Sequence, residues 1–299
     1  MRFRNRLIPI VICFAVAVLI LAAGLNYTYD PLDSFQARQQ GRINESVSIP
    51  ILMYHHFSDN GAPGSVISAD MFECHMKALV EAGCSFVSFR EVCDYVNYGT
   101  PLPEKPVLIT IDDGYTSVYE TAYPILLKYN IKATVFIVGA FYGKAQYKDT
   151  PYLLIPPHFG DDEAREMIES GLISIQSHSY DMHQYEPYEL EYRRGILRKP
   201  GETREEYDEV FRADFEFASA QIENTTGLKP FVYSYPFGRH TNRSETLLKG
   251  MGVESTVTII PGMNTIIKGV PESMYKLRRF IVYGDMTPEK LLKKIHNNG

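Results

Sequence analysis

Residues 107–115 read Val-Leu-Ile-Thr-Ile-Asp-Asp-Gly-Tyr, and this stretch decides the fold that we expect. An apolar, uncharged run leads directly into two adjacent acids and a glycine. Such a run is typical of a strand that is buried on both faces of a parallel sheet. Gly114 allows the bend that aims its neighbours in different directions. Because functional residues gather at the carboxyl ends of parallel strands, Asp112 and Asp113 are the first candidates for a site.

Short apolar runs alternate with helical patterns on both sides of this stretch. Strands are predicted at residues 49–54, 86–88, 107–111, 133–138, 172–176, 231–235, 253–259 and 277–282. Helices are predicted at residues 69–82, 89–98, 117–129, 162–170, 205–225 and 288–295, with another around 247–250. This alternation predicts an α/β fold built on a parallel sheet, closed or open.

The chain starts with a basic segment that is followed by an apolar one. Three arginines precede residues 7–25, which carry no charged side chain. As a helix this stretch would be about 28 Å long, close to the roughly 30 Å hydrocarbon core of a bilayer. Because basic residues stay in the cytoplasm, the rest of the chain is expected outside the cell membrane. We expect residues 1–25 to form an uncleaved signal anchor. The alternative is a signal peptide that is cleaved near residues 22–24 and yields a secreted protein.

Beyond the anchor, composition predicts a tether and one domain. Residues 26–45 are polar and without apolar periodicity, as in a linker, and residues 46–299 are expected to form a single domain. The three cysteines of that domain have no C-x-x-C spacing, which argues against a zinc knuckle or a disulfide framework. A net charge of -6 without a long basic run argues against a nucleic-acid partner. We expect a monomer.

Polar groups follow four of the predicted strands: His55-His56, Asp112-Asp113, His178 with His183, and the turn Tyr-Pro-Phe-Gly at 235–238. Strand ends converge over one mouth of such a sheet, where active sites usually lie. Two adjacent acids repel unless a cation neutralises them. A divalent metal could bind one carboxylate while the other faces the substrate as a base. The alternative is an acidic turn that caps the next helix.

The two histidines of residues 176–183 are five positions apart. Five helical positions rotate about 500°, so His178 and His183 would not share one helix face and can converge only from a curved loop. Two histidines with one carboxylate and open positions are typical of a catalytic metal site rather than a structural one. Zinc is our first expectation, and iron, cobalt and nickel also suit these ligands. Asp181 either orients a ligand or solvates the loop.

Together these segments resemble the NodB-homology polysaccharide deacetylases (carbohydrate esterase family four). Residues 111–114, Ile-Asp-Asp-Gly, are similar to the first family motif, and residues 178–183 to the second. The wide histidine spacing and the opening residues 49–55, Ile-Pro-Ile-Leu-Met-Tyr-His, resemble the branch that deacetylates poly-β-1,6-N-acetylglucosamine, whose motif order is circularly permuted. Residues 235–238 resemble the third motif, and residues 277–282 resemble a late family strand.

The resemblance implies a distorted (β/α) barrel. It also implies metal-dependent hydrolysis of N-acetyl groups from an extracellular polysaccharide that contains N-acetylglucosamine, with release of acetate. The implied roles are metal binding by Asp113, His178 and His183, proton abstraction from water by Asp112, protonation of the leaving amine by His55, and contact with the oxyanion and substrate by Phe237 and Tyr235.

The sequence departs from the family pattern in two places. Many members carry an arginine at the start of the third motif, where this chain has Ser234, so the residue that steadies Asp112 stays open. No Leu-His pair occurs near the C-terminus, so either His55 is the acid, with His56 as its competitor, or the site has no histidine acid. Because side chains alternate along an extended segment, only one of the two can face the site.

Two other functions stay open. The same ligands would serve an esterase that removes O-acetyl groups from glycans. The missing motif-three arginine would suit a homologue that binds carbohydrate without catalysis. Three further histidines are interpreted as surface or loop residues: His75, His158 and His240.

Overall fold

The computed structural model describes residues 45–59, 64–148, 150–184, 188–189 and 192–296. The predicted anchor at residues 1–25 and the tether up to residue 44 lie outside these residues. Within the described part, no helix combines the length and the apolar character needed to cross a membrane.

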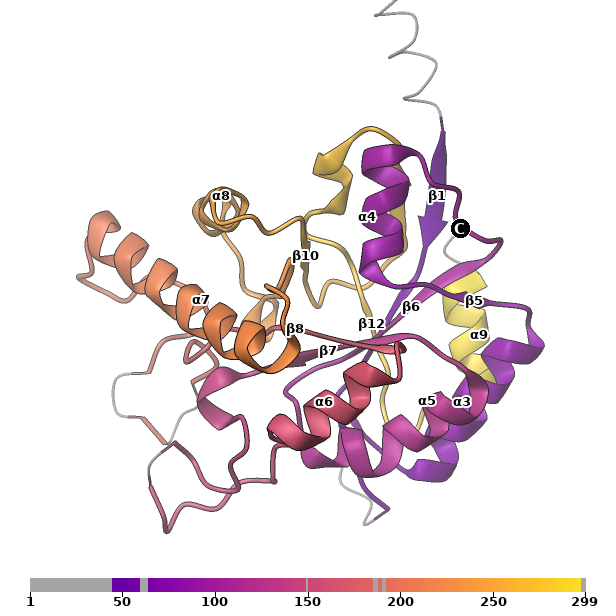
Figure 1. Cartoon of the computed structure of the whole chain (residues 1–299), viewed down its shortest axis with the longest axis horizontal. Coiled ribbons are helices and arrows are strands. Elements are labelled where there is room, and N and C mark those ends of the chain that lie inside the picture. The colour runs from indigo at the N-terminus through magenta and orange to yellow at the C-terminus, as the bar shows by residue number, and fades with distance from the viewer. Residues whose placement is uncertain (1–44, 60–63, 149, 185–187, 190–191, 297–299) are drawn as a thin grey trace, which may run out of the picture. The chain divides into compact units, whose positions relative to one another are not determined.

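A curled parallel sheet forms the centre of the domain (Figure 1). Its strand order is β10 (Ser255–Val257), β9 (Val232–Ser234), β8 (Ile173–Ser177), β7 (Ala133–Ile137), β6 (Pro106–Ile111), β2 (Ile51–Tyr54) and β12 (Phe280–Ile281), and β5 (Ser85–Phe86) also pairs with β6. The residues just before β12 bond to β10. Leu277 N–H donates to the Thr256 carbonyl, and Thr258 N–H donates to the Leu277 carbonyl, both at 2.8 Å. The two ends of the sheet are thereby bridged, and the predicted α/β class with a parallel sheet is confirmed.

Seven α-helices lie within the described residues, and each contains or overlaps a predicted helix. They are α3 (Ala69–Glu81), α4 (Phe89–Tyr98), α5 (Tyr123–Tyr129), α6 (Asp161–Glu169), α7 (Arg204–Thr226), α8 (Asn242–Gly250) and α9 (Pro288–His296). Ser68 caps α3 by accepting from Met71 N–H, as its position in the sequence predicts. The predicted helix at residues 117–129 instead starts with a π-helical turn, η1 (Val118–Ala122).

Small elements complete the fold, and the sequence patterns did not predict most of them. Strand β1 (Ser46–Ile49) pairs antiparallel with β11 (Asn264–Ile267), and β3 (His56–Phe57) pairs with β4 (Val66–Ile67). Three short 3-10 turns are η2 (Gly139–Phe141), η3 (Pro236–Gly238) and η4 (Pro271–Met274). The β11 segment lacks a distinctive pattern, because its strand exists only by pairing with a segment more than 200 residues away.

Both faces of the sheet are covered. On one face, β-strand residues pack with α3, α5, α6 and α9 in the largest apolar core. On the other, Ile51, Leu108 and Phe136 pack with residues of α4, β1 and β11. The complete burial of β6 on both faces explains its unbroken apolar sequence.

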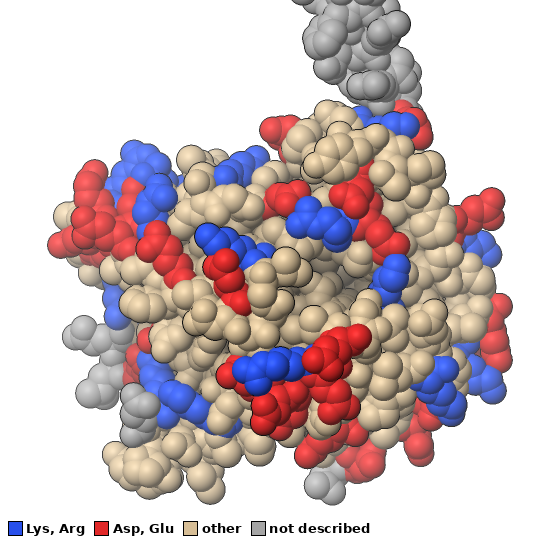
Figure 2. Space-filling model, viewed as in Figure 1, with Lys and Arg blue, Asp and Glu red and all other residues tan. Residues whose placement is uncertain are grey.

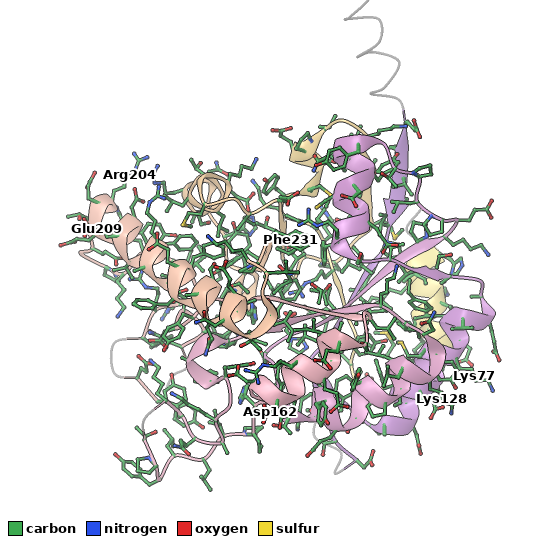
Figure 3. The ribbon with its side chains drawn as sticks, viewed as in Figure 1. Lys77, Lys128, Asp162, Arg204, Glu209 and Phe231 are labelled. Atoms are coloured by element: carbon green, nitrogen blue, oxygen red, sulfur yellow. The ribbon has the colours of Figure 1, made fainter. Side chains whose placement is uncertain are left out.

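Helix α7 is the longest described helix, and its inner part packs against β8 and α6. Thr203 and Glu206 form a capping box at its start, and Gly227 ends it in a left-handed conformation. Arg204 and Glu209 lie at its outer end, away from the sheet (Figure 3). On the visible face, acidic and basic side chains are interspersed (Figure 2).

The interpretation of His75 as a surface or loop residue is wrong. It lies on the buried face of α3 with no exposed surface, and its Nε2 is 2.7 Å from the Met286 carbonyl. His158 is in a loop, as expected, but it is buried between the rings of Tyr115 and Phe141. The sequence around a single histidine does not show whether its side chain is buried, because the groups that contact the ring come from distant segments.

Candidate active site

One cavity of about 490 Å³ gathers the predicted site residues at the carboxyl ends of the strands. Its lining includes His55 after β2, the two acids after β6, His178 and His183 after β8, and Tyr235 and Phe237 after β9. The predicted convergence of four strand ends is therefore confirmed. The geometric reason is that all four strands are parallel and their carboxyl ends lie along the same edge of the sheet.

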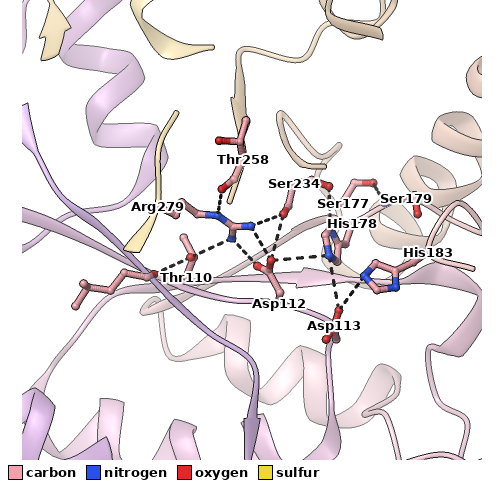
Figure 4. Close-up of polar contacts among 11 residues, drawn as sticks. Thr110, Asp112, Asp113, Ser177, His178, Ser179, His183, Ser234, Thr258 and Arg279 are labelled. Atoms are coloured by element: carbon pink, nitrogen blue, oxygen red, sulfur yellow. Dashed lines mark hydrogen bonds and ion pairs between the residues drawn. The ribbon is translucent and has the colours of Figure 1, made fainter. Parts of the chain in front are cut away.

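Asp113, His178 and His183 form a compact buried cluster (Figure 4). The Asp113 Oδ1 lies 3.7 Å from Nε2 of His178 and 3.6 Å from Nε2 of His183. One ligand atom from each of the three residues lies within 4.8 Å of the other two. Among the described residues, nothing donates a hydrogen bond to the buried Asp113 Oδ1. Burying a carboxylate oxygen without a hydrogen-bond donor costs folding free energy unless a cation binds to it.

Each imidazole has a feature that suits a metal ligand. Nδ1 of His178 lies 2.7 Å from the Ser234 carbonyl, which only accepts, so Nδ1 donates to it and Nε2 is the nitrogen that faces Asp113. Burial, opposed by the nearby charge of Asp113, lowers the pKa of His183 to about 4 and keeps its ring neutral. One carboxylate and two imidazoles match the ligand set of zinc and related divalent ions, so the residues fit the implied metal.

Asp112 lies beside this cluster but is bound differently. Arg279 Nη1 donates to its Oδ1 and Nη2 donates to its Oδ2, each at 2.7 Å, and both side chains are almost completely buried. Burial by itself would raise the pKa of Asp112, but the Arg279 guanidinium and His178 outweigh it and hold that pKa well below its ordinary range. Asp112 is therefore ionised and has no proton to donate.

Sequence reasoning did not identify Arg279 as the residue that steadies Asp112. Its guanidinium also donates from Nε to the Thr258 carbonyl at 2.8 Å and from Nη2 to the Ser234 hydroxyl at 3.0 Å. Ser234 thus stands beside the guanidinium and leaves space for it. The only signal in the sequence was a basic pair inside an apolar strand candidate, Arg278-Arg279. In the extended segment just before β12, Arg278 is exposed and Arg279 is buried.

The two adjacent histidines take opposite directions, as alternation predicts. His55 lines the cavity, and among the described residues nothing bonds to its buried Nδ1. Nδ1 of His56 lies 2.8 Å from the Ser117 hydroxyl, and its ring packs on Tyr115, so His56 is not among the residues that line the cavity. The geometry therefore favours His55 over His56 as a residue that contacts substrate.

Three non-glycine residues at the site have left-handed backbone conformations: Asp113 (φ 75°), Ser179 (φ 74°) and Phe237 (φ 56°). Such conformations cost free energy and concentrate at functional sites. The predicted bend at residue 114 is present, with φ 81°, and a Cβ there would lie 2.9 Å from the Ile137 side chain. Position 114 therefore requires glycine, and Asp113 has a strained backbone. This sharp bend directs the side chains of Asp112 and Asp113 differently.

Phe237 and Tyr235 lie in the turn that follows β9. The Phe237 ring packs against His183, with 4.3 Å between ring centroids, and lines the cavity. The Tyr235 side chain is buried, and its hydroxyl donates to the buried carboxylate of Glu245. That bond anchors the turn to α8, so Tyr235 supports the cavity wall, whereas Phe237 forms its surface.

A comparison with family models matches residues 99–256 to polysaccharide deacetylase. This match covers more than half of the chain and includes both acids, both histidines and the turn after β9. The chain belongs to the polysaccharide deacetylase family. Members of this family are hydrolases, and the resemblance inferred from the motifs is confirmed.

Two relatives carry names that agree with this family. The chain is 28% identical over 246 residues to a putative polysaccharide deacetylase, YxkH, of Bacillus subtilis, covering 82% of this chain and 75% of that protein. It is 29% identical over 142 residues to the poly-beta-1,6-N-acetyl-D-glucosamine N-deacetylase of Staphylococcus aureus, covering 48% of this chain and 47% of that protein. The second match spans about half of each chain.

Solved polysaccharide deacetylase structures share the fold. A de-N-acetylase from Aggregatibacter actinomycetemcomitans superposes with a TM-score of 0.71 at 24% identity, covering 83% of this chain and 100% of the other. IcaB from Ammonifex degensii superposes with a TM-score of 0.67 at 22% identity, covering 83% and 97%. The curled parallel sheet described above is therefore the polysaccharide deacetylase fold.

Proposed function

We propose that this polysaccharide deacetylase hydrolyses N-acetyl groups of a glycan that contains N-acetylglucosamine, with a divalent metal held by Asp113, His178 and His183. One observation supports the proposal above all. A buried carboxylate-imidazole cluster and a second, arginine-bound carboxylate, Asp112, line the same cavity. A metal held there would supply positive charge that polarises the acetyl carbonyl and lowers the pKa of water.

The residues around the cluster divide the proton transfers between them. Asp112, held ionised by Arg279, accepts the proton of the attacking water. The backbone N–H of Phe237 donates to the oxygen that becomes negative as the carbonyl is attacked. His55, which also lines the cavity, donates a proton to the leaving amine. The products are acetate and a glycan with a free amino group.

The hollow surface around the cluster has room for more than an acetyl group. A second cavity of about 300 Å³ shares Asp113 and Tyr115 with the first and is walled mainly by apolar and aromatic side chains, including Phe141 and Tyr147. Rings of this kind present flat apolar faces to a ligand. We propose that both cavities contact the glycan.

We also propose that the domain acts outside the cell membrane. The apolar segment at residues 7–25 supports this location, because such a segment after three arginines is typical of a signal anchor.

The alternative of a binding protein without catalysis rested on the arginine missing at Ser234. Arg279 supplies a guanidinium at that place, so this argument loses its basis. An esterase acting on O-acetyl groups would use the same residues. Acetate release from matched N-acetylated and O-acetylated glycans, including poly-β-1,6-N-acetylglucosamine, chitooligosaccharide and peptidoglycan, separates the two activities.

The test of the catalytic assignment is Asp112→Asn. We expect acetate release to fall by about 10²–10⁴-fold while zinc still binds, because the three metal ligands are unchanged. Replacing the charge also leaves Arg279 without its counter-ion, so folding is checked by circular dichroism. Near-normal turnover of folded Asp112→Asn would show that another group abstracts the proton.

A further inference from the structure

Helix α7 has a stripe of buried residues that faces the sheet: Tyr207, Phe211, Asp214, Phe215, Ala218 and Ile222. The 3–4 residue spacing is that of a helix packed on a core. Asp214 is the charged member of this stripe, with 8% of its surface exposed. Burial raises its pKa to about 6, so the carboxylate is held in an environment that disfavours its charge.

The Asp214 carboxylate bonds to the segment between the two histidines of the metal cluster. Its Oδ2 accepts from Tyr180 N–H at 2.9 Å, and its Oδ1 accepts from Asp181 N–H at 2.7 Å. Both oxygens are thus used by adjacent backbone groups of a segment that has neither helical nor strand structure. Hydrogen bonds to a carboxylate are about twice as strong as those between neutral groups.

Other contacts hold the same segment. Lys148 Nζ binds the Asp181 carboxylate, and the Phe217 ring of α7 packs against the Tyr180 ring, with 5.7 Å between ring centroids. Ser179 N–H donates to the Ser177 hydroxyl, and Met182 N–H donates to the Ser179 hydroxyl. The carbonyls of residues 179 and 180 accept from the N–H groups of Gly139 and Ala140 in η2. Figure 4 shows Ser177 and Ser179 beside the two histidines. Asp214 differs from these contacts because one side chain of α7 accepts from two consecutive N–H groups, those of residues 180 and 181.

We propose that Asp214 is a positioning residue for the metal centre. By fixing the backbone at residues 180 and 181, it sets the curvature that lets two histidines five positions apart direct Nε2 atoms at one carboxylate, Asp113. A helix would separate these histidines, and an unanchored loop would lose conformational entropy on binding metal. This inference rests on the proposed function, because it assigns Asp214 to the metal site of that function.

The test is a calorimetric titration with zinc of the metal-free full chain and of two variants, Asp214→Asn and Asp214→Ala. We expect Asp214→Ala to weaken zinc binding by about 10–100-fold, as for other groups that orient metal ligands from outside the ligand shell. Asp214→Asn keeps one acceptor oxygen and should lose less. The matched control is Asp208→Asn, on the same helix, whose carboxylate pairs with Arg243 instead.

Hydrogen exchange of the peptide that contains residues 178–183, measured without metal, gives a readout that does not depend on activity. Exchange should accelerate in both Asp214 variants and stay unchanged in Asp208→Asn. If folded Asp214→Ala binds zinc as tightly as the unaltered chain, or if its exchange is unchanged, the inference is overturned. If the unaltered chain itself does not bind zinc, it is the proposed function that fails, whatever the exchange data show.

Discussion

Arg279 binds both carboxylate oxygens of Asp112, and the two residues are 167 positions apart in the chain. The strand order explains how they meet. Asp112 follows β6 and Arg279 precedes β12, and β2 lies between these two strands in the sheet. The side-chain fork of an arginine fits a carboxylate with two parallel bonds, which a lysine cannot reproduce. The catalytic assignment of Asp112 therefore depends on a residue outside the motif that contains it.

Arg279→Lys should reduce acetate release by about 10–100-fold, because a single ammonium cannot hold both oxygens of Asp112. Arg279→Met should in addition lower the free energy of unfolding by about 3–5 kcal/mol, because it leaves a buried carboxylate without its partner. Urea unfolding and initial rates measure the two effects. The matched control is Arg278→Lys, next to it and exposed, which should change neither quantity. Equal effects at both positions would contradict the role given to Arg279.

Removal of metal should abolish acetate release and leave the domain folded, since the core packs without the cluster. Readdition of zinc should restore the rate. Variants His178→Ala and His183→Ala should each fail to retain a stoichiometric metal after dialysis, as measured by atomic emission. A chelated protein that keeps its full rate would be incompatible with the proposed metal site.

His55→Gln should lower kcat by about 10²–10⁴-fold if His55 donates the proton to the leaving amine. His56→Gln should have a much smaller effect, because the His56 ring is turned to Ser117 and Tyr115. The pair is a close control, since the residues are adjacent and chemically the same. A leaving group that needs no proton should restore most of the rate of His55→Gln. If His56→Gln lowered kcat more than His55→Gln, His56 would be the proton donor instead of His55.

The stability of the chain should depend on pH through Asp214. Its pKa is raised from 3.8 to about 6 on folding, so between about pH 4 and pH 6 the folded chain binds more protons than the unfolded chain. The contribution of Asp214 to the free energy of unfolding therefore decreases as pH rises through this window, by about 3 kcal/mol at about 1.4 kcal/mol per unit.

The measurement is the difference in unfolding free energy between the unaltered chain and Asp214→Asn at pH 4.5 and pH 7. This difference should become less favourable to the unaltered chain at the higher pH. Asp208→Asn should show the opposite trend, because the hydrogen bond from Arg243 lowers the pKa of Asp208. If the stability difference between the unaltered chain and Asp214→Asn stayed constant or increased from pH 4.5 to pH 7, the raised pKa of Asp214 would be contradicted.

The elements that the sequence predicts well are those whose signal is local. The run before Asp112, the cap at Ser68 and the long helix at residues 205–225 each carry their pattern within a few turns or a few strand positions. Elements β11 and η1 were missed or misread for the opposite reason. β11 is defined by its partner β1, and η1 is a change in hydrogen-bond register that side-chain periodicity does not distinguish.

For the site, the sequence by itself predicted the two acids, the two histidines, the pair His55-His56 and the family, because motif residues follow strand ends and strand ends converge in a parallel sheet. Only the tertiary structure decided which of the two adjacent histidines lines the cavity and which distant residues position Asp112 and the histidine loop. Arg279 reaches Asp112 and Asp214 reaches residues 180–181 from elements distant in sequence, and no local pattern encodes such contacts. The physical reason is that a buried charge is stable only beside a group that compensates it, and the packing of the sheet and helices determines which group lies there.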